Sequence, residues 1–150
     1  MLTIRDAATD DMPTIVEFNR LLAEETEGKR LDAAVLERGV RRALERHDMC
    51  RYFVAERGGQ LVGQTMITYE LTDWRDGVLW WIQSVYVRGD ARGQGVFRAL
   101  FEHVERLARG DAEARGLRLY VAEHNAAALA TYERLGLRPS GHRVYEIDWS

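Results

Sequence analysis

The sequence is poor in cysteine and proline, and it has no long hydrophobic run. A single cysteine, Cys50, excludes an intrachain disulfide framework and is compatible with a reducing compartment. The four histidines have no metal-ligand spacing with Cys50 or with one another, so we expect no metal site. No stretch has the length and apolarity of a membrane span, and the chain opens on a strand pattern rather than a signal peptide. We therefore expect a cytoplasmic protein outside the membrane.

An excess of charge of either sign is also missing. The chain has 21 basic and 24 acidic side chains, a net charge of −3. Such a small charge argues against a general attraction to nucleic acid. Hydrophobic residues make up 46% of the 150 residues, which is enough for one core and leaves no room for a second. We expect a single domain over residues 1–150.

The centre of the chain combines an apolar strand, a glycine-rich turn and an amphipathic helix. The strand at residues 80–87 belongs to two alternating apolar sets, Val78-Trp80-Ile82-Tyr86 and Leu79-Trp81-Val85-Val87, as in a strand covered on both faces. Residues 96–109 repeat apolar side chains at three- and four-residue steps, and Gly110 follows as a stop signal. Between them, Arg92-Gly93-Gln94-Gly95 allows a tight turn at a helix N-terminus, where unpaired N–H groups favour a phosphate.

The remaining pattern predicts a mixed α/β fold of the order β-α-α-β-β-β-α-β-α-β. Helices are expected from residue 9 onward, with a face of Ile15, Phe18 and Leu22, and after Asp32, with a buried stripe of Val35, Leu36, Val40, Ala43 and Leu44. Strands are expected at 2–5, 51–56, 61–71, 78–87, 116–122 and 143–149, with hairpin turns at 57–60 and 72–77. The strand–helix–strand unit after residue 78 implies a parallel crossover.

A short alanine-rich helix is expected over residues 125–135. Asn125 and Tyr132 are seven residues apart, so they share one face with roughly 10 Å of helix axis between them. Ala128 lies between them, and the three would leave a groove with an amide near one end and a proton-donating phenol at the other. In a simpler interpretation, Asn125 only caps the helix and Tyr132 only packs against the sheet.

Together, the glycine turn and this helix resemble the acetyl-coenzyme A site of the GNAT superfamily of N-acyltransferases. The family's turn pattern is Arg or Gln, two residues, Gly, one residue, and Gly or Ala; residues 92–97 match it except at the last position, which is Phe97. The family's later pattern is matched by Asn125, Ala128, Tyr132 and Gly136. The resemblance also covers the order of elements over nearly the whole chain.

The resemblance implies a GNAT-like fold, with a central mixed sheet of about seven strands and about four helices, and acetyl-coenzyme A as co-substrate. It implies that backbone groups of Val85 and Val87 bind the pantetheine arm and that Asn125 contacts the arm from the other side. Tyr132 would protonate the departing thiolate. The pyrophosphate would lie on the turn and the start of the helix, at Arg92, Gly93, Gln94, Gly95, Val96, Phe97 and Arg98. We expect the Phe97 ring to turn into the core beside Phe101.

The implied reaction is direct acetyl transfer to a primary amine, which must first lose a proton. An ordinary amine pKa lies some three units above pH 7, so this costs about 4 kcal/mol. Relatives often use a glutamate in the middle of the central strand as the base, but those positions here are Gln83 and Ser84. A water relay or an acidic group from elsewhere must act instead.

The acceptor is expected to be a small cationic amine. Candidate acceptor-binding residues are Glu24, Glu25, Glu27, Glu70, Trp81 and Gln83. The acidic residues 24–27 have a second interpretation as a solvated turn, and tryptophans of a central strand are more often part of the core. The resemblance also allows a homodimer.

Two other functions fit part of the pattern. A dinucleotide-binding module would use the same strand–turn–helix order, but Arg98 stands where the third glycine of Gly-x-Gly-x-x-Gly belongs. A non-catalytic domain that only holds acyl-coenzyme A would explain the missing strand-centred glutamate. Binding of NAD against coenzyme A separates the first from an acetyltransferase, and turnover separates the second.

Overall fold

The computed structural model describes residues 1–150, which divide into two compact units, Met1–Leu119 and Tyr120–Ser150. The strands of the first unit are β1 (Leu2–Asp6), β2 (Cys50–Arg57), β3 (Gln60–Thr72), β4 (Gly77–Val87) and β5 (Ala114–Leu119). Its helices are α1 (Met12–Glu27), α2 (Ala33–Glu45) and α3 (Val96–Arg109), with 3₁₀ turns η1 (Thr9–Asp11), η2 (Asp73–Arg75) and η3 (Gly89–Ala91). The second unit contains α4 (Ala126–Arg134). None of the helices combines the length and the hydrophobicity that a membrane-spanning helix needs.

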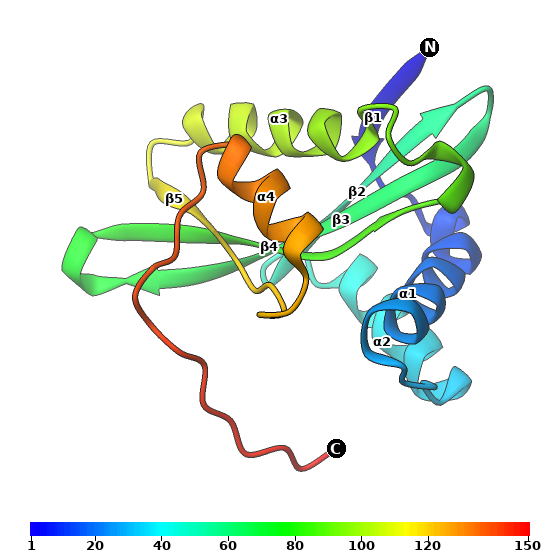
Figure 1. The fold of residues 1–150 in the computed structure, drawn as a ribbon, viewed down its shortest axis with the longest axis horizontal. Coiled ribbons are helices and arrows are strands. Elements are labelled where there is room, and N and C mark those ends of the chain that lie inside the picture. The colour runs from blue at the N-terminus through cyan, green and yellow to red at the C-terminus, as the bar shows by residue number, and fades with distance from the viewer. The chain divides into compact units, whose positions relative to one another are not determined.

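One mixed sheet organises the first unit, with its strands in the order β1-β2-β3-β4-β5 (Figure 1). Neighbouring strands are antiparallel from β1 to β4, and only β4 and β5 are parallel. Helix α3 makes the crossover between these two, as the strand–helix–strand pattern predicts. A run of four antiparallel strands is incompatible with the doubly wound parallel sheet of a dinucleotide-binding module.

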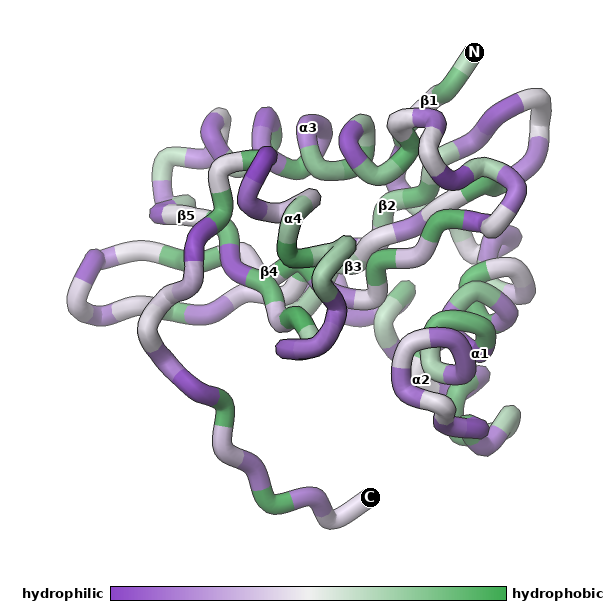
Figure 2. Tube along the Cα trace, viewed as in Figure 1, coloured by the Kyte–Doolittle hydropathy of each residue, from purple (hydrophilic) through white to green (hydrophobic).

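Helices cover both faces of this sheet. In β2, the Phe53 ring meets the His103 ring of α3 edge-on at 5.2 Å, whereas the neighbouring Tyr52 hydroxyl accepts a hydrogen bond from Asn19 of α1 at 3.0 Å. Because successive residues of a strand point to opposite faces, α3 lies on one face and α1 on the other (Figure 1). The side of α3 that faces the sheet is hydrophobic (Figure 2), and its Leu100 and Val104 are fully buried.

The second helix begins where its cap predicts. The Asp32 carboxylate accepts a hydrogen bond from the Val35 backbone N–H at 2.9 Å, and the helix follows immediately. The predicted buried stripe is wrong at Val35, whose side chain is exposed, whereas Leu36 of the same helical turn packs against the core around Val40. Val40 is buried as predicted.

The link from β1 to α1 depends on an ion pair. Asp11, the N-cap of α1, accepts two hydrogen bonds from the Arg5 guanidinium, at 2.8 and 3.0 Å, and one from the Ala8 backbone N–H at 2.7 Å. The Asp11 side chain is only 11% exposed. The hydrogen bonds from Arg5 hold the pKa of Asp11 below its usual range, against the opposing effect of burial.

Replacing Asp11 with asparagine should lower the free energy of unfolding at pH 7 by about 1–2 kcal/mol. The folded-state pKa of Asp11 is lowered, so its contribution is complete above the unfolded pKa of about 3.9 and is lost as pH falls through the folded value. Urea titrations from pH 7 to pH 3 should therefore show the two proteins converging. The exposed neighbour provides the control, since Asp10→Asn should change little. A difference independent of pH would contradict a charge-based role.

The predicted last strand and the predicted strand number are wrong. Residues 143–149 form no strand, and the sheet has five strands rather than about seven. Hydrophobic and polar residues alternate along this segment (Figure 2), but Tyr145, Ile147 and Trp149 are at least 80% exposed. The only regular element of the Tyr120–Ser150 unit is a helix, so this unit contains no second strand to pair with the segment's backbone.

Candidate functional site

The turn between β4 and α3 leaves a backbone surface open at a helix N-terminus. Gly93 and Gly95 have φ angles of +74° and +81°, which L side chains rarely adopt, and a Cβ atom added at either would meet no other atom within 4 Å. Gly95 is the N-cap of α3, and no side chain caps the helix. The first-turn N–H groups and the positive end of the helix dipole are therefore available to an anion.

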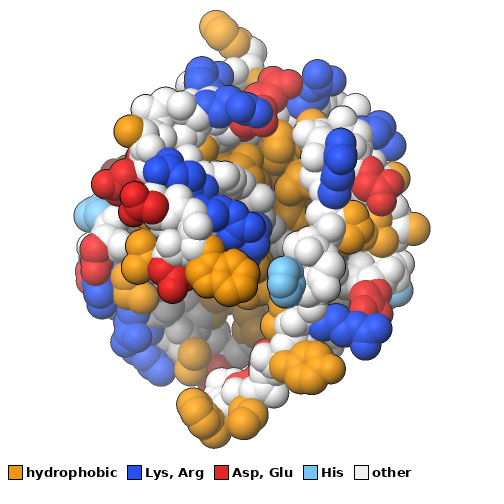
Figure 3. Space-filling model, turned by 90° about the vertical axis from the view of Figure 1, so that its left-hand side faces the viewer, with side chains coloured by type: hydrophobic (Ala, Val, Ile, Leu, Met, Phe, Trp, Pro, Cys, Tyr) orange, Lys and Arg blue, Asp and Glu red, His pale blue; other side chains and the backbone are white.

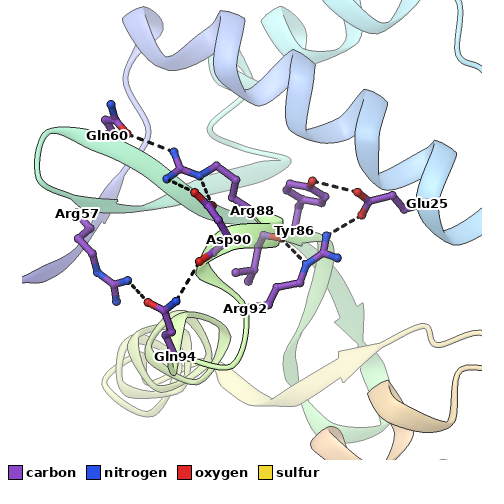
Figure 4. Close-up of polar contacts among 9 residues, drawn as sticks. Glu25, Arg57, Gln60, Tyr86, Arg88, Asp90, Arg92 and Gln94 are labelled. Carbon is purple, nitrogen blue, oxygen red and sulfur yellow. Dashed lines mark hydrogen bonds and ion pairs between the residues drawn. The ribbon is translucent and has the colours of Figure 1, made fainter.

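Side-chain hydrogen bonds connect this turn to the β2–β3 hairpin (Figure 4). Arg57 donates a hydrogen bond to Gln94 Oε1 at 2.7 Å, and Gln94 Nε2 donates to the Asp90 carbonyl at 3.0 Å. Arg88 binds both carboxylate oxygens of Asp90, at 2.6 and 3.1 Å, and reaches Gln60 at 3.4 Å. These contacts occupy the Gln94 side chain, so its contribution to a bound anion would come from its backbone.

Arg92 connects the turn to the end of α1 (Figure 4). Its Nε donates to the Val87 carbonyl at 2.9 Å, and its guanidinium pairs with Glu25 at 2.6 Å. The guanidinium also lies over the Tyr86 ring, 5.4 Å from the centroid, and the Tyr86 hydroxyl donates to Glu25 at 3.4 Å. The hydrogen bond with Glu25 raises the pKa of Arg92, and burial raises that of Tyr86, so both stay protonated at neutral pH.

The two parallel strands stop pairing before the end of β4. Their ladder ends at Ile82, which faces Leu119 of β5, so no strand of the Met1–Leu119 unit pairs with β4 on that side beyond Ile82. This open edge contains Val85 and Val87, the residues predicted to bind a ligand through their backbone. Ser84 precedes them with a φ of +51°, in the left-handed region.

The side chain that departs from the predicted turn pattern does not stand over the turn. Phe97 is partly buried, and its ring lies 6.3 Å from the Phe101 ring, as predicted. Val96 is buried beside it and anchors the first turn of α3 to the core. The backbone of the turn is therefore not screened by the bulky residue at position 97.

Three of the predicted acceptor residues lie on one face of the sheet. The Trp81 indole donates to Glu70 at 2.9 Å, and Gln83 Nε2 donates to the Thr68 hydroxyl at 2.6 Å. Arg118 of β5 joins them, 3.3 Å from Glu70 and 6.0 Å from the Trp81 ring centroid. Thr68 and Arg118 were not among the predicted site residues. Both lie in predicted strands, and each is the partner of Trp81 in a neighbouring strand.

The acidic end of α1 does not form a shared acidic rim. Glu24 pairs with Arg20 at 2.9 Å and Glu27 with Lys29 at 3.8 Å, and Glu25 pairs with Arg92 as described above. Each carboxylate thus has its own cation, and all three side chains are more than 40% exposed. Pairing of this kind weakens the attraction of the turn for a cationic ligand.

In the second unit, α4 has the expected cap and spacing. Asn125 Oδ1 accepts a hydrogen bond from the Ala128 backbone N–H at 3.1 Å, which makes Asn125 the N-cap of α4. Tyr132 follows two turns later and is partly buried, and burial raises the pKa of its hydroxyl. The phenol is therefore protonated at neutral pH, the form in which it can donate a proton.

Comparison with protein families gives one match over most of the chain. A model described as "Acetyltransferase (GNAT) family" matches residues 14–137. This range includes the glycine turn, the open edge of β4 and the whole of α4. A search of curated proteins finds no match.

Solved structures match over nearly the full length. The chain is 42% identical to a possible acetyltransferase from Clostridium difficile 630, with 99% of this chain and 97% of that chain covered and a TM-score of 0.92. It shares its fold with a predicted acetyltransferase from Clostridium acetobutylicum solved with acetyl-CoA (18% identity, 98% and 96% covered, TM-score 0.77). It also shares its fold with AAC(6')-Iy in complex with the bisubstrate analogue CoA-S-monomethyl-acetylneamine (16% identity, 100% and 99% covered, TM-score 0.77).

Proposed function

Because the chain belongs to the acetyltransferase (GNAT) family, we propose that it transfers an acetyl group from acetyl-coenzyme A directly to a primary amine. The observation that carries this proposal is the open glycine turn at the N-terminus of α3, placed immediately after the open edge of β4. The structure of the Clostridium acetobutylicum protein with acetyl-CoA supports the choice of co-substrate.

The residues of the turn fit a pyrophosphate. Gly93 and Gly95 leave the backbone open, and the uncapped first turn of α3 supplies N–H donors. Arg92 and Arg98 add positive charge, and the Arg98 side chain is 73% exposed beside Glu102, so it can turn toward a ligand. Backbone groups of Val85 and Val87 would hold the pantetheine arm along β4, with Asn125 on its other side.

Acetyl-coenzyme A supplies an acetyl group activated as a thioester. In the proposed reaction the amine nitrogen bonds to the acetyl carbon while the carbon–sulfur bond breaks, and Tyr132 gives its proton to the departing sulfur. The raised pKa of Tyr132 keeps that proton in place until it is needed. The amine must lose a proton of its own, and since neither Gln83 nor Ser84 is a base at pH 7, we propose that water carries it away.

We propose a small cationic amine as the acceptor, bound near the polar face formed by Glu70, Trp81 and Gln83. Glu70 offers a carboxylate and Trp81 an aromatic wall, a combination suited to an ammonium group. The complex of AAC(6')-Iy with an analogue that joins CoA to an amine supports a ternary arrangement in this fold. Glu24, Glu25 and Glu27 each pair with a cation, and Glu70 likewise lies 3.3 Å from Arg118, but only Glu70 also contacts the Trp81 indole.

Other partners and the location follow from composition. We propose that the protein is cytoplasmic, which its single, buried Cys50 supports. We also propose that it does not bind nucleic acid. Basic and acidic side chains both occur across the face shown in Figure 3, and the net charge is −3, so no broad basic surface is seen there. A homodimer stays a prediction.

Replacing Glu25 with glutamine should tighten acetyl-coenzyme A binding by about two- to fivefold, because Arg92 then loses its competing carboxylate. The effect should shrink as salt is raised. Calorimetry at two ionic strengths measures it, and Glu24→Gln is the control, since Glu24 pairs with Arg20 instead. Weaker binding in the Glu25 variant would mean that Glu25 orients Arg92 rather than competing with a phosphate.

The function is tested by following thiol release from acetyl-coenzyme A with a panel of amines that includes polyamines, free amino acids, aminoglycosides and peptide N-termini. Turnover with at least one cationic amine is expected, with the product acetylated on nitrogen. Tight binding of acetyl-coenzyme A without turnover on any amine would instead identify a non-catalytic acyl-coenzyme A-binding domain.

A further inference from the structure

The central strand β4 is interrupted by a bulge at Ser84. Gln64 of β3 faces Tyr86 and Met66 faces Gln83, so the single residue Thr65 stands opposite two residues of β4. Ser84 adopts a φ of +51°, which costs an L residue free energy. Such a bulge bends the strand and re-aims the groups that follow it.

Side chains of β3 take the place of the interrupted backbone ladder. Gln64 Nε2 donates a hydrogen bond to the Ser84 carbonyl at 3.1 Å, and Thr65 Oγ1 donates to the Gln83 carbonyl at 3.1 Å. Both donors are within the core, with residue exposures of 0% for Gln64 and 1% for Thr65. Two consecutive polar side chains thus satisfy the two carbonyl groups at the bulge.

Gln64 would be a poor choice if it served only to fill the core. Its Oε1 atom is buried and has no hydrogen-bond partner, which destabilises the folded state. An apolar side chain of similar size, such as methionine, would avoid this cost. What the amide provides is its N–H donor, and that donor is used on Ser84.

The bulge lies where β4 changes from a paired strand to an open edge. Pairing with β5 ends at Ile82, and the bulge comes two residues later, directly before Val85 and Val87. We propose that Gln64 and Thr65 are positioning residues for acetyl-coenzyme A, because they hold the bulge that directs the backbone groups of Val85 and Val87 toward the open edge. This inference rests on the proposed function.

Two substitutions remove the donors while preserving size, Gln64→Met and Thr65→Val. We expect each to raise the Kd for acetyl-coenzyme A by about tenfold, measured by calorimetry. Thr72→Val is the matched control: it makes the same change at the other end of β3, in a residue that is also buried and whose hydroxyl accepts only from Arg75. The control should bind within about twofold of the wild type.

A rescue experiment separates positioning from packing. Glycine adopts a positive φ without steric conflict, so Ser84→Gly should favour the bulge even when its donors are missing. The Gln64→Met, Ser84→Gly double variant should therefore recover most of the lost affinity, with Ser84→Gly alone as reference for loss of the hydroxyl. Unchanged affinity in both donor variants, or no recovery in the double variant, would overturn the positioning role. Absence of binding in the wild type would overturn the proposed function instead.

Discussion

Replacement of Tyr132 by phenylalanine should lower kcat by about a hundredfold or more while changing the affinity for acetyl-coenzyme A by less than about twofold. A phenol that donates its proton to the leaving sulfur acts mainly in the transition state, so its loss affects turnover more than binding. Burial raises the pKa of Tyr132, so ionisation of this group should reduce kcat only above the ordinary tyrosine pKa of about 10. Steady-state kinetics and calorimetry on the same preparation measure both quantities.

Tyr145→Phe is the matched control, because this substitution also removes a tyrosine hydroxyl from the same unit, at a residue that is 87% exposed. It should leave kcat unchanged. Equal losses of turnover and affinity in the Tyr132 variant would show that Tyr132 binds or packs rather than donating a proton. Full turnover without the Tyr132 hydroxyl would remove it from the mechanism.

Replacing Gly95 with glutamate should reduce the affinity for acetyl-coenzyme A by at least about a hundredfold. The new carboxylate would occupy the open side of the turn, next to the uncapped N-terminus of α3, where the pyrophosphate is proposed to bind. It would also neutralise the helix end that attracts the anion. Calorimetric titration of the variant gives the result directly.

This substitution also forces a side chain onto a backbone with a φ of +81°, so strain needs its own control. Gly58 in the β2–β3 hairpin has a φ of +59° and equally open surroundings. Gly58→Glu therefore adds the same charge under similar strain outside the turn, and it should bind acetyl-coenzyme A normally. Near-normal affinity in Gly95→Glu would remove the turn from the cofactor site.

Features set by neighbouring residues were predictable from the sequence. Helix α3 begins at Val96 and ends at Arg109, as the apolar repeat and Gly110 predict, because an amphipathic helix is encoded within its own length. Asn125 likewise caps α4 through the Ala128 N–H, three residues away. The position of Phe97 beside Phe101 follows from the same helical spacing.

Features that need a distant partner were not predictable. The alternation at residues 143–149 resembles a strand, but pairing depends on a second strand, and the Tyr120–Ser150 unit has none. The Glu25–Arg92 pair joins residues 67 apart, so the sequence near Glu25 does not show which cation neutralises its carboxylate. Counting the carboxylates at the end of α1 without the cations that pair with them overstates its negative charge.

The bulge in β4 leaves a mark in the amino-acid sequence of two strands. Serine is not a residue type that favours a positive φ, and in residues 80–87 the only mark of an interruption is the polar pair Gln83-Ser84. The neighbouring strand carries a matching mark, because Gln64 and Thr65 are two consecutive polar residues between apolar neighbours, and one of them faces the core on each side of the sheet. Buried polar residues in a strand need partners, and here the partners are the carbonyl groups of the bulge.

The central claim, that the turn between β4 and α3 holds the pyrophosphate of acetyl-coenzyme A, is tested most directly by calorimetric titration. The wild-type protein would be titrated in parallel with acetyl-coenzyme A, NAD and ATP. Binding of acetyl-coenzyme A at about micromolar Kd, with weaker or no binding of the other two, is the predicted result. No binding of acetyl-coenzyme A, or tighter binding of NAD, would contradict it.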